Sequence, residues 1–227
     1  MVEQSWLTHI GILAFLAVVP FLVVACTSFA KVAIVLGIVR NSLGGQGVIP
    51  VTVISALSAV ITLFIMGPVV DDMLDASLPR SGTRSDAESG EDAAANKEET
   101  GRIFDNAMAI YQAVSPPLIQ FLRQNTPEEE RTFFANLDRG KNADASSVRV
   151  LTMAFASSEL LEALALGVLV LIPFLVLDLI VANTLSALGL VSLSPVAVAL
   201  PLKLLLFIAA DGWHLLVNAL IISYGVP

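Results

Sequence analysis

Long apolar runs separated by short polar breaks dominate the chain. Four of them approach or exceed the ~20 residues that an α-helix needs to cross a bilayer core. They are Ile10–Cys26, Val48–Val70, Ala163–Ala182 and Val196–Tyr224. The pattern predicts an all-α integral membrane protein in which hydrophobic helical hairpins flank a small polar helical domain, inserted between the second and third hydrophobic helices.

This pattern divides the chain into an N-terminal hairpin (1–70), a polar domain (71–150) and a C-terminal hairpin (151–227). In the first hairpin we expect a helix over 6–39, a glycine-rich turn over 41–50, and a second helix over 51–70 that ends at Gly67-Pro68. Residues 80–101 are rich in Ser, Gly and acids and hold no large apolar side chain. Such a segment cannot bury a core, so we expect a disordered acidic loop.

Two short helices are predicted inside the polar domain. Apolar residues recur at three- and four-residue spacing over 103–118, which indicates an amphipathic helix that Pro116-Pro117 breaks or kinks near Ser115. In the next helix, Thr126 is the expected cap, Pro127 takes the first helical position and Glu129 completes a capping box.

The C-terminal hairpin holds an unusual connector. Ser146-Ser147 should start its first helix, Pro173 should kink that helix, and residues 183–195 (NTLSALGLVSLSP) join it to the last one. An exposed loop would be polar, whereas this one is apolar and rich in small residues. Lipid, a partner or other copies of the chain must therefore cover its large side chains: Leu188, Leu190, Val191 and Leu193.

Composition supports a membrane protein and locates its charges. Of the 227 residues, 56% are hydrophobic and 14% are charged, against about 25% charged in globular domains. The net charge of -8 argues against a nucleic-acid partner. Between Asp71 and Asp144 lie 15 of the 20 acids, so most charges belong to the polar domain.

The N-terminal segment contains a sequence that is similar to a lipoprotein cleavage box, ending at Cys26. No Lys or Arg precedes Ile10, whereas a signal peptide needs a positive start. We therefore expect an uncleaved first helix with Cys26 buried. Lys31 and Arg40 flank the first turn and predict that it is cytoplasmic, which puts the polar domain on the opposite side and the 183–195 connector back on the cytoplasmic side.

Charged residues inside the last apolar run require partners. Lys203 either reaches the membrane interface or pairs with an acid, for which Asp178 on the preceding helix is the candidate. Asp211 and His214 are three residues apart and can pair with each other on one helix. With Glu159, these residues form a predicted set of polar contacts between helices, because membrane helices use polar groups to associate.

Three chemical alternatives follow from the same residues. Asp178 and Asp211 could form a two-carboxylate protease site, but the Gly-x-Gly-Asp of intramembrane aspartyl proteases is replaced by Ala209-Ala210-Asp211. The sequence has neither a Gly-x-Ser-x-Gly turn nor Cys/His metal spacing, so we expect no enzyme, metal or cofactor. Proton-coupled transport through Asp178, Asp211 and His214 is the serious alternative, since buried Asp and His form relays.

Several segments together resemble the FliP/SctR family of the type III export apparatus. They are Thr27–Lys31, Val39–Gly44, Phe64–Val69, Ala154–Leu160 with Gly167, Ile172–Asp178, Pro201–Lys203 and Asp211–Trp213. The resemblance covers both hydrophobic parts and is most specific in the last two motifs. The polar domain lies in the family's place but matches poorly in sequence.

The resemblance implies a non-enzymatic, pore-forming subunit in the bacterial inner membrane, with its polar domain in the periplasm. It also implies a ring of about five copies, small FliQ/SctS-type and FliR/SctT-type partners, and unfolded secreted proteins as substrates. The family's gating loop corresponds to Leu188–Ser194, where many members carry methionines and this chain carries none. We expect Leu188, Leu190, Val191 and Leu193 to form the pore gasket instead. An injectisome rather than a flagellar protein is favoured.

Overall fold

The computed structural model describes residues 24–44, 49–77, 114–138, 147–190 and 192–225, with single helical positions at 17, 21 and 112. In this part of the chain the regular structure is entirely helical and no strand occurs, which confirms the all-α prediction. The predicted loop over 80–101 and nearly half of the first predicted helix (6–39) lie outside the described residues.

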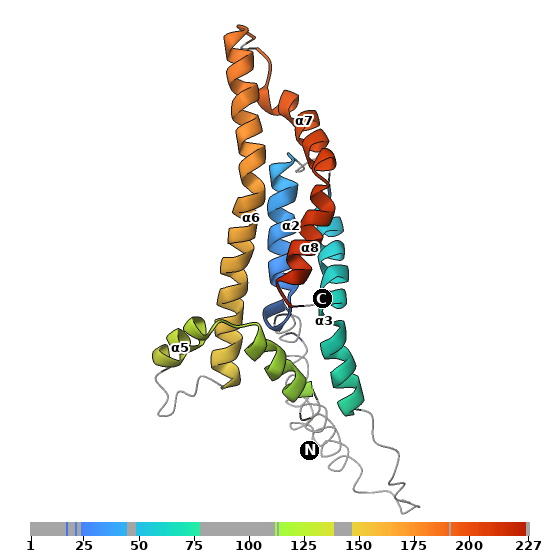
Figure 1. Ribbon diagram of the computed structural model, residues 1–227, viewed down its shortest axis with the longest axis vertical. Coiled ribbons are helices and arrows are strands. Elements are labelled where there is room, and N and C mark those ends of the chain that lie inside the picture. Colours follow the sequence, from blue (N-terminus) through green and yellow to red (C-terminus); the bar gives the residue numbers. More distant parts are fainter. Residues whose placement is uncertain are drawn as a thin grey trace, which may run out of the picture.

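One long helix organises the molecule (Figure 1). Helix α6 spans Val148–Ala187, and at 1.5 Å per residue its 40 residues extend over about 60 Å. It begins where predicted, because Ser147 caps it by accepting a hydrogen bond from the Val150 amide at 3.4 Å. Pro173 lies inside the helix, which continues beyond it to Ala187.

The other elements pack along α6. Helix α2 (Phe29–Ser42) lies against α6 and α3 (Val51–Ser77), and α5 (Glu128–Leu137) crosses near the start of α6. Helices α7 (Pro195–Ala209) and α8 (Gly212–Ile222) return from the far end of α6 toward α2 (Figure 1). Helix α2 thus occupies the middle of the bundle.

The main core lies where α2, α3, α6 and α8 meet a helical segment at 114–124. Its fully enclosed residues include Val32, Val35, Ile65, Leu122, Leu151, Phe155 and Leu220. Helices α2 and α6 approach closely because Gly167 has no side chain: a Cβ there would lie 2.2 Å from Cδ1 of Ile38. The expected burial of Cys26 is confirmed.

Two predicted helix boundaries are wrong. Helix α3 does not end at Gly67-Pro68 but continues through Pro68 to Ser77, since one proline removes one hydrogen bond while the turns on both sides keep theirs. The break or kink predicted at Pro116-Pro117 stays a prediction, because both prolines lie in the helical segment at 114–124 while most of the residues from 103 to 113 lie outside the described part of the chain. Thr126 is not a cap: its buried hydroxyl donates back to the Leu122 carbonyl at 2.5 Å, and α5 starts at Glu128.

The sequence predicts one helix for the last apolar run, whereas the structure has two. It breaks between α7 and α8, whose axes differ by 61°. Asp211 adopts the left-handed conformation with φ 50° and ψ 40°, which interrupts the helical ladder. In the described part of the chain, α3 and α6 are long and apolar enough to span a membrane, and the bent α7–α8 pair makes a third span if counted as one.

Candidate functional site

The connector between α6 and α7 is a tight, well-hydrogen-bonded turn. Gly189 takes the left-handed conformation with φ 71°. Its amide donates to the Ser186 carbonyl at 3.0 Å, and the Leu190 amide donates to the Leu185 carbonyl at 2.9 Å. This pair of bonds is a Schellman motif, and it ends α6 with its last carbonyls satisfied. A further bond of 3.2 Å from the Leu193 amide to the Leu190 carbonyl tightens the turn.

The side chains on this turn are apolar and exposed. Leu188, Leu190 and Leu193 are 66%, 41% and 47% exposed, and Val191 lies outside the described residues. The turn occupies the end of α6 farthest from α5 (Figure 1). A single chain therefore presents a hydrogen-bonded tip whose leucines are exposed. Exposure of such an apolar surface to water is unfavourable and indicates that it is covered by another molecule.

Lys203 lies at a buried junction of three helices. Its ammonium group donates to the Ser42 carbonyl of α2 at 2.9 Å and lies 2.8 Å from Oδ2 of Asp178 on α6. The residue is 7% exposed, so it does not extend to a membrane interface from this position. Because an unpaired buried charge is costly, this pair fixes the position of α7 against α6 and α2.

Asp211 and His214 lie at the break between α7 and α8. Nδ1 of His214 is 2.6 Å from Oδ1 of Asp211, and both side chains are exposed. Among the described residues no hydrogen bond or ion pair joins them to another helix, unlike the inter-helix contact expected from the sequence. Asp178 and Asp211 thus have separate partners, Lys203 and His214 respectively.

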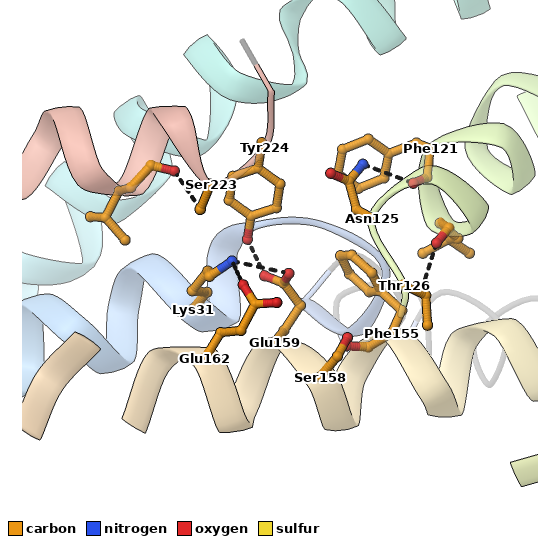
Figure 2. A network of polar contacts seen from close by, with 12 residues as sticks. Lys31, Phe121, Asn125, Thr126, Phe155, Ser158, Glu159, Glu162, Ser223 and Tyr224 are labelled. Atoms are coloured by element: carbon orange, nitrogen blue, oxygen red, sulfur yellow. Dashed lines mark hydrogen bonds and ion pairs between the residues drawn. The ribbon is translucent and has the colours of Figure 1, made fainter. Parts of the chain in front are cut away.

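Glu159 is the centre of a buried polar network (Figure 2). Its Oε1 lies 3.4 Å from the Lys31 ammonium group on α2, and its Oε2 accepts a hydrogen bond from the Tyr224 hydroxyl. The same ammonium group lies 2.5 Å from Glu162 and 4.3 Å from the centre of the Tyr224 ring. Lys31 and Glu159 are 1% and 2% exposed, so their contact is shielded from water, whereas Glu162 at the edge of the network is 45% exposed.

Aromatic packing closes the network on the side of the polar domain. The ring of Tyr224 stacks on Phe121 at 6.2 Å, and Phe121 meets Phe155 edge-to-face at 5.6 Å. Burial, followed by the neighbouring Glu159 carboxylate, raises the pKa of the Tyr224 hydroxyl well above its usual value. The hydroxyl therefore stays protonated and available as a donor to Glu159.

Sequence reasoning included Glu159 in the polar set but missed its partners Lys31, Glu162 and Tyr224. Lys31 served only as a marker of orientation. A lysine inside an apolar run needs an acidic partner, so the position of Lys31 could have been used to predict a contact with Glu159. Among the described residues no group of three or more His, Cys, Asp and Glu is arranged to hold a metal ion.

Comparison with known proteins places these features in a family. The model of the FliP family matches residues 12–220. The virulence protein YscR of Salmonella typhimurium is 35% identical over 229 residues, covering 98% of each chain. The Yop proteins translocation protein R of Yersinia pestis is 33% identical over 221 residues, covering 94% of each. The flagellar biosynthetic protein FliP of Bacillus subtilis is 30% identical over 219 residues, covering 94% of this chain and 89% of the relative.

Proposed function

Since the chain belongs to the FliP family of type III secretion export proteins, we propose that it is a structural, pore-forming subunit of the export gate. Unfolded secreted proteins pass through this gate. The proposal assigns no catalytic group to the chain.

The observation that carries the proposal is the exposed apolar turn between α6 and α7. Leu188, Leu190 and Leu193 project from a backbone that the Schellman motif makes rigid. Several copies arranged around an axis would bring these leucines together into an apolar constriction, which obstructs ions by excluding water. The gasket of this chain thus consists of leucine, together with Val191, rather than of methionine.

Assembly follows from the surface of α6. Its apolar residues are exposed along most of its length, including Leu161, Val168, Leu169, Ile172, Leu179 and Ile180. Lipid and neighbouring subunits would cover them, which supports assembly with other chains. The proposed ring of about five copies and its FliQ/SctS-type and FliR/SctT-type partners follow from the family resemblance. We place the ring in the inner membrane with the polar domain in the periplasm. Native mass spectrometry of the purified complex gives the copy number, and a monomer without partners contradicts the proposal.

The gasket is tested by placing a charge in it. Leu190→Asp should raise ion leak through the assembled complex and alter secretion, while co-purification with the partner subunits is unchanged. Leu137→Asp is the matched control, because Leu137 is also an exposed leucine (59%) but lies at the end of α5, far from the turn. Wild-type leak and secretion in Leu190→Asp would overturn the gasket.

The identities favour an injectisome subunit, since 35% to the virulence protein YscR and 33% to the Yop proteins translocation protein R exceed 30% to the flagellar protein FliP. Complementation decides the question: we expect the gene to restore secretion in an injectisome deletion strain and not motility in a flagellar one. Restored motility alone would reverse the assignment.

Proton-coupled transport stays the second candidate. A relay needs adjacent titratable groups, and in the described structure no hydrogen bond or ion pair joins Asp178 to Asp211 or His214. Asp211→Asn separates the two functions. Intact assembly with lost proton dependence favours the relay, and unchanged proton dependence favours the gate.

A further inference from the structure

The C-terminal strap, which we define as residues 195–224, is attached to the rest of the molecule at its two ends. On α7, Ala199 is 1% exposed against Val181 and Leu185, and the buried Lys203 pairs with Asp178, whose side chain is 37% exposed. Beyond the break, Leu216, Leu220 and Tyr224 are buried in the main core. From 204 to 215 no residue is buried, although the half-buried Leu206 and Phe207 pack against the main core, so the middle of the strap is less deeply packed than its ends.

The break lies in this less deeply packed middle and has a left-handed backbone. Asp211 is the only non-glycine residue with positive φ in the described chain. Aspartate adopts this region more readily than most residues with a Cβ, but glycine adopts it at a lower cost. Its one side-chain contact, with His214, is exposed and contributes little to holding the backbone. Gly212 permits the bend, since a Cβ there would lie 2.5 Å from the Phe207 ring and 3.0 Å from the Phe207 carbonyl oxygen.

An apolar pocket of about 280 Å³ lies under the break. Leu169 and Phe174 of α6 form part of its wall, and Phe207, Ala210, Gly212 and Leu215 of the strap form part of its cover. Apolar walls without contact atoms lose dispersion energy, so the pocket favours movement of the strap toward α6. A change of Asp211 out of the left-handed conformation would also favour movement of the strap toward α6.

We propose that Asp211 is a hinge, and that the strap has a second position in which its middle lies closer to α6 and the pocket is lost. Movement at this hinge shifts the part of α7 beyond Lys203, whereas the Lys203–Asp178 pair holds the part that leads to the connector. The hinge rests on the strap geometry alone and does not depend on the proposed function.

Distances between two spin labels test the hinge in the assembled complex, reconstituted in lipid nanodiscs. One label replaces Ile208 on α7, which is 76% exposed, and the other replaces Leu161 on α6, which is 55% exposed. Labelled chains are diluted with unlabelled ones so that only distances within a chain are measured, and Cys26→Ala removes the native thiol.

Two substitutions at the hinge should act in opposite directions. Asp211→Val disfavours the left-handed conformation and should raise the ratio of the shorter to the longer distance about fivefold, while Asp211→Gly should lower it by a similar factor. Ala210→Phe fills the pocket and should leave only the longer distance. Ala209→Phe is the control, because Ala209 is exposed, does not line the pocket and should keep the wild-type distribution.

Equal distance distributions in wild type, Asp211→Val and Ala210→Phe would overturn the hinge. If Asp211→Val fails to assemble, Asp211→Gly and Ala210→Phe still decide, since both preserve the bent form that the structure shows. Because the measurement uses no secretion or leak assay, it can fail while the gate stands, and the gate can fail while the hinge stands.

Discussion

Removing one member of the buried network around Glu159 should destabilise the protein far more than removing the whole network. The first change is Lys31→Met, which keeps the apolar stem and deletes the ammonium group. Glu159, 2% exposed, is then left as a buried carboxylate whose described partner is only the Tyr224 hydroxyl.

The magnitude follows from the burial of both partners. Breaking a buried ion pair on one side costs about 3–5 kcal/mol, whereas replacing both charges by apolar groups is often neutral or stabilising. Glu159→Leu alone should cost a similar amount and, in addition, leaves the Tyr224 hydroxyl without its acceptor, at about 1–3 kcal/mol. The triple variant Lys31→Met, Glu159→Leu, Tyr224→Phe removes every orphaned group except Glu162. That side chain is 45% exposed and reaches water.

Thermal unfolding of the purified complex measures these differences. For a chain of this size, 3–5 kcal/mol corresponds to a fall in Tm on the order of 10 °C for each single variant. The triple variant should melt within a few degrees of wild type. Arg149→Met provides the control, because Arg149 pairs with Asp138 while 74% exposed, and exposed pairs contribute about 0–1 kcal/mol.

Comparison of the single variants with the triple variant also gives the result that would refute the reasoning. If the losses of the single variants add up in the triple variant, the residues do not act as a coupled unit. If Lys31→Met melts like Arg149→Met, then the ammonium group of Lys31 is not compensating a buried carboxylate.

Three further predictions concern backbone fit and protonation. Gly167→Val should separate α2 from α6, because even a Cβ would lie 2.2 Å from Cδ1 of Ile38. The substitution should cost about 1–3 kcal/mol in thermal unfolding, or abolish assembly as measured by co-purification. A wild-type Tm refutes this prediction. Gly189→Ala should cost about 1–2 kcal/mol because of its φ of 71°, and a stability unchanged in thermal unfolding would exclude strain there. Tyr224 should not ionise at pH 11, because its pKa is raised by burial and by Glu159. Tyr224→Phe should therefore leave the absorbance titration at 295 nm unchanged between pH 9 and 11. Loss of a titration step in this variant contradicts the prediction. The hydrogen bond to Glu159 should likewise persist through this range in the folded protein. Its contribution to stability is complete only below the unfolded-state pKa of about 10 and declines above it, because the tyrosine of the unfolded chain ionises there.

Much of the helical plan was readable from local patterns. Apolar runs of spanning length predicted α3 and α6. Ser147 correctly predicted the start of α6, because capping depends on the capping residue and its nearest neighbours. The errors came where packing outweighed a local preference. Thr126 has the chemistry of a cap, but burial assigned its hydroxyl to the helix before it.

The sequence by itself determined the fold class, the membrane character, the family and the apolar connector, since each depends on composition, short-range pattern or ordered motifs. The tertiary structure alone decided which charges meet. Lys31 and Glu159 are 128 positions apart, and Glu159 and Tyr224 are 65 apart. Their contact depends on the rotation and register of three helices, which are set by packing of apolar surfaces and by the close approach at Gly167. The break at Asp211 also emerged only in the structure: aspartate tolerates the left-handed backbone, but its place in a long apolar run predicts a continuous helix.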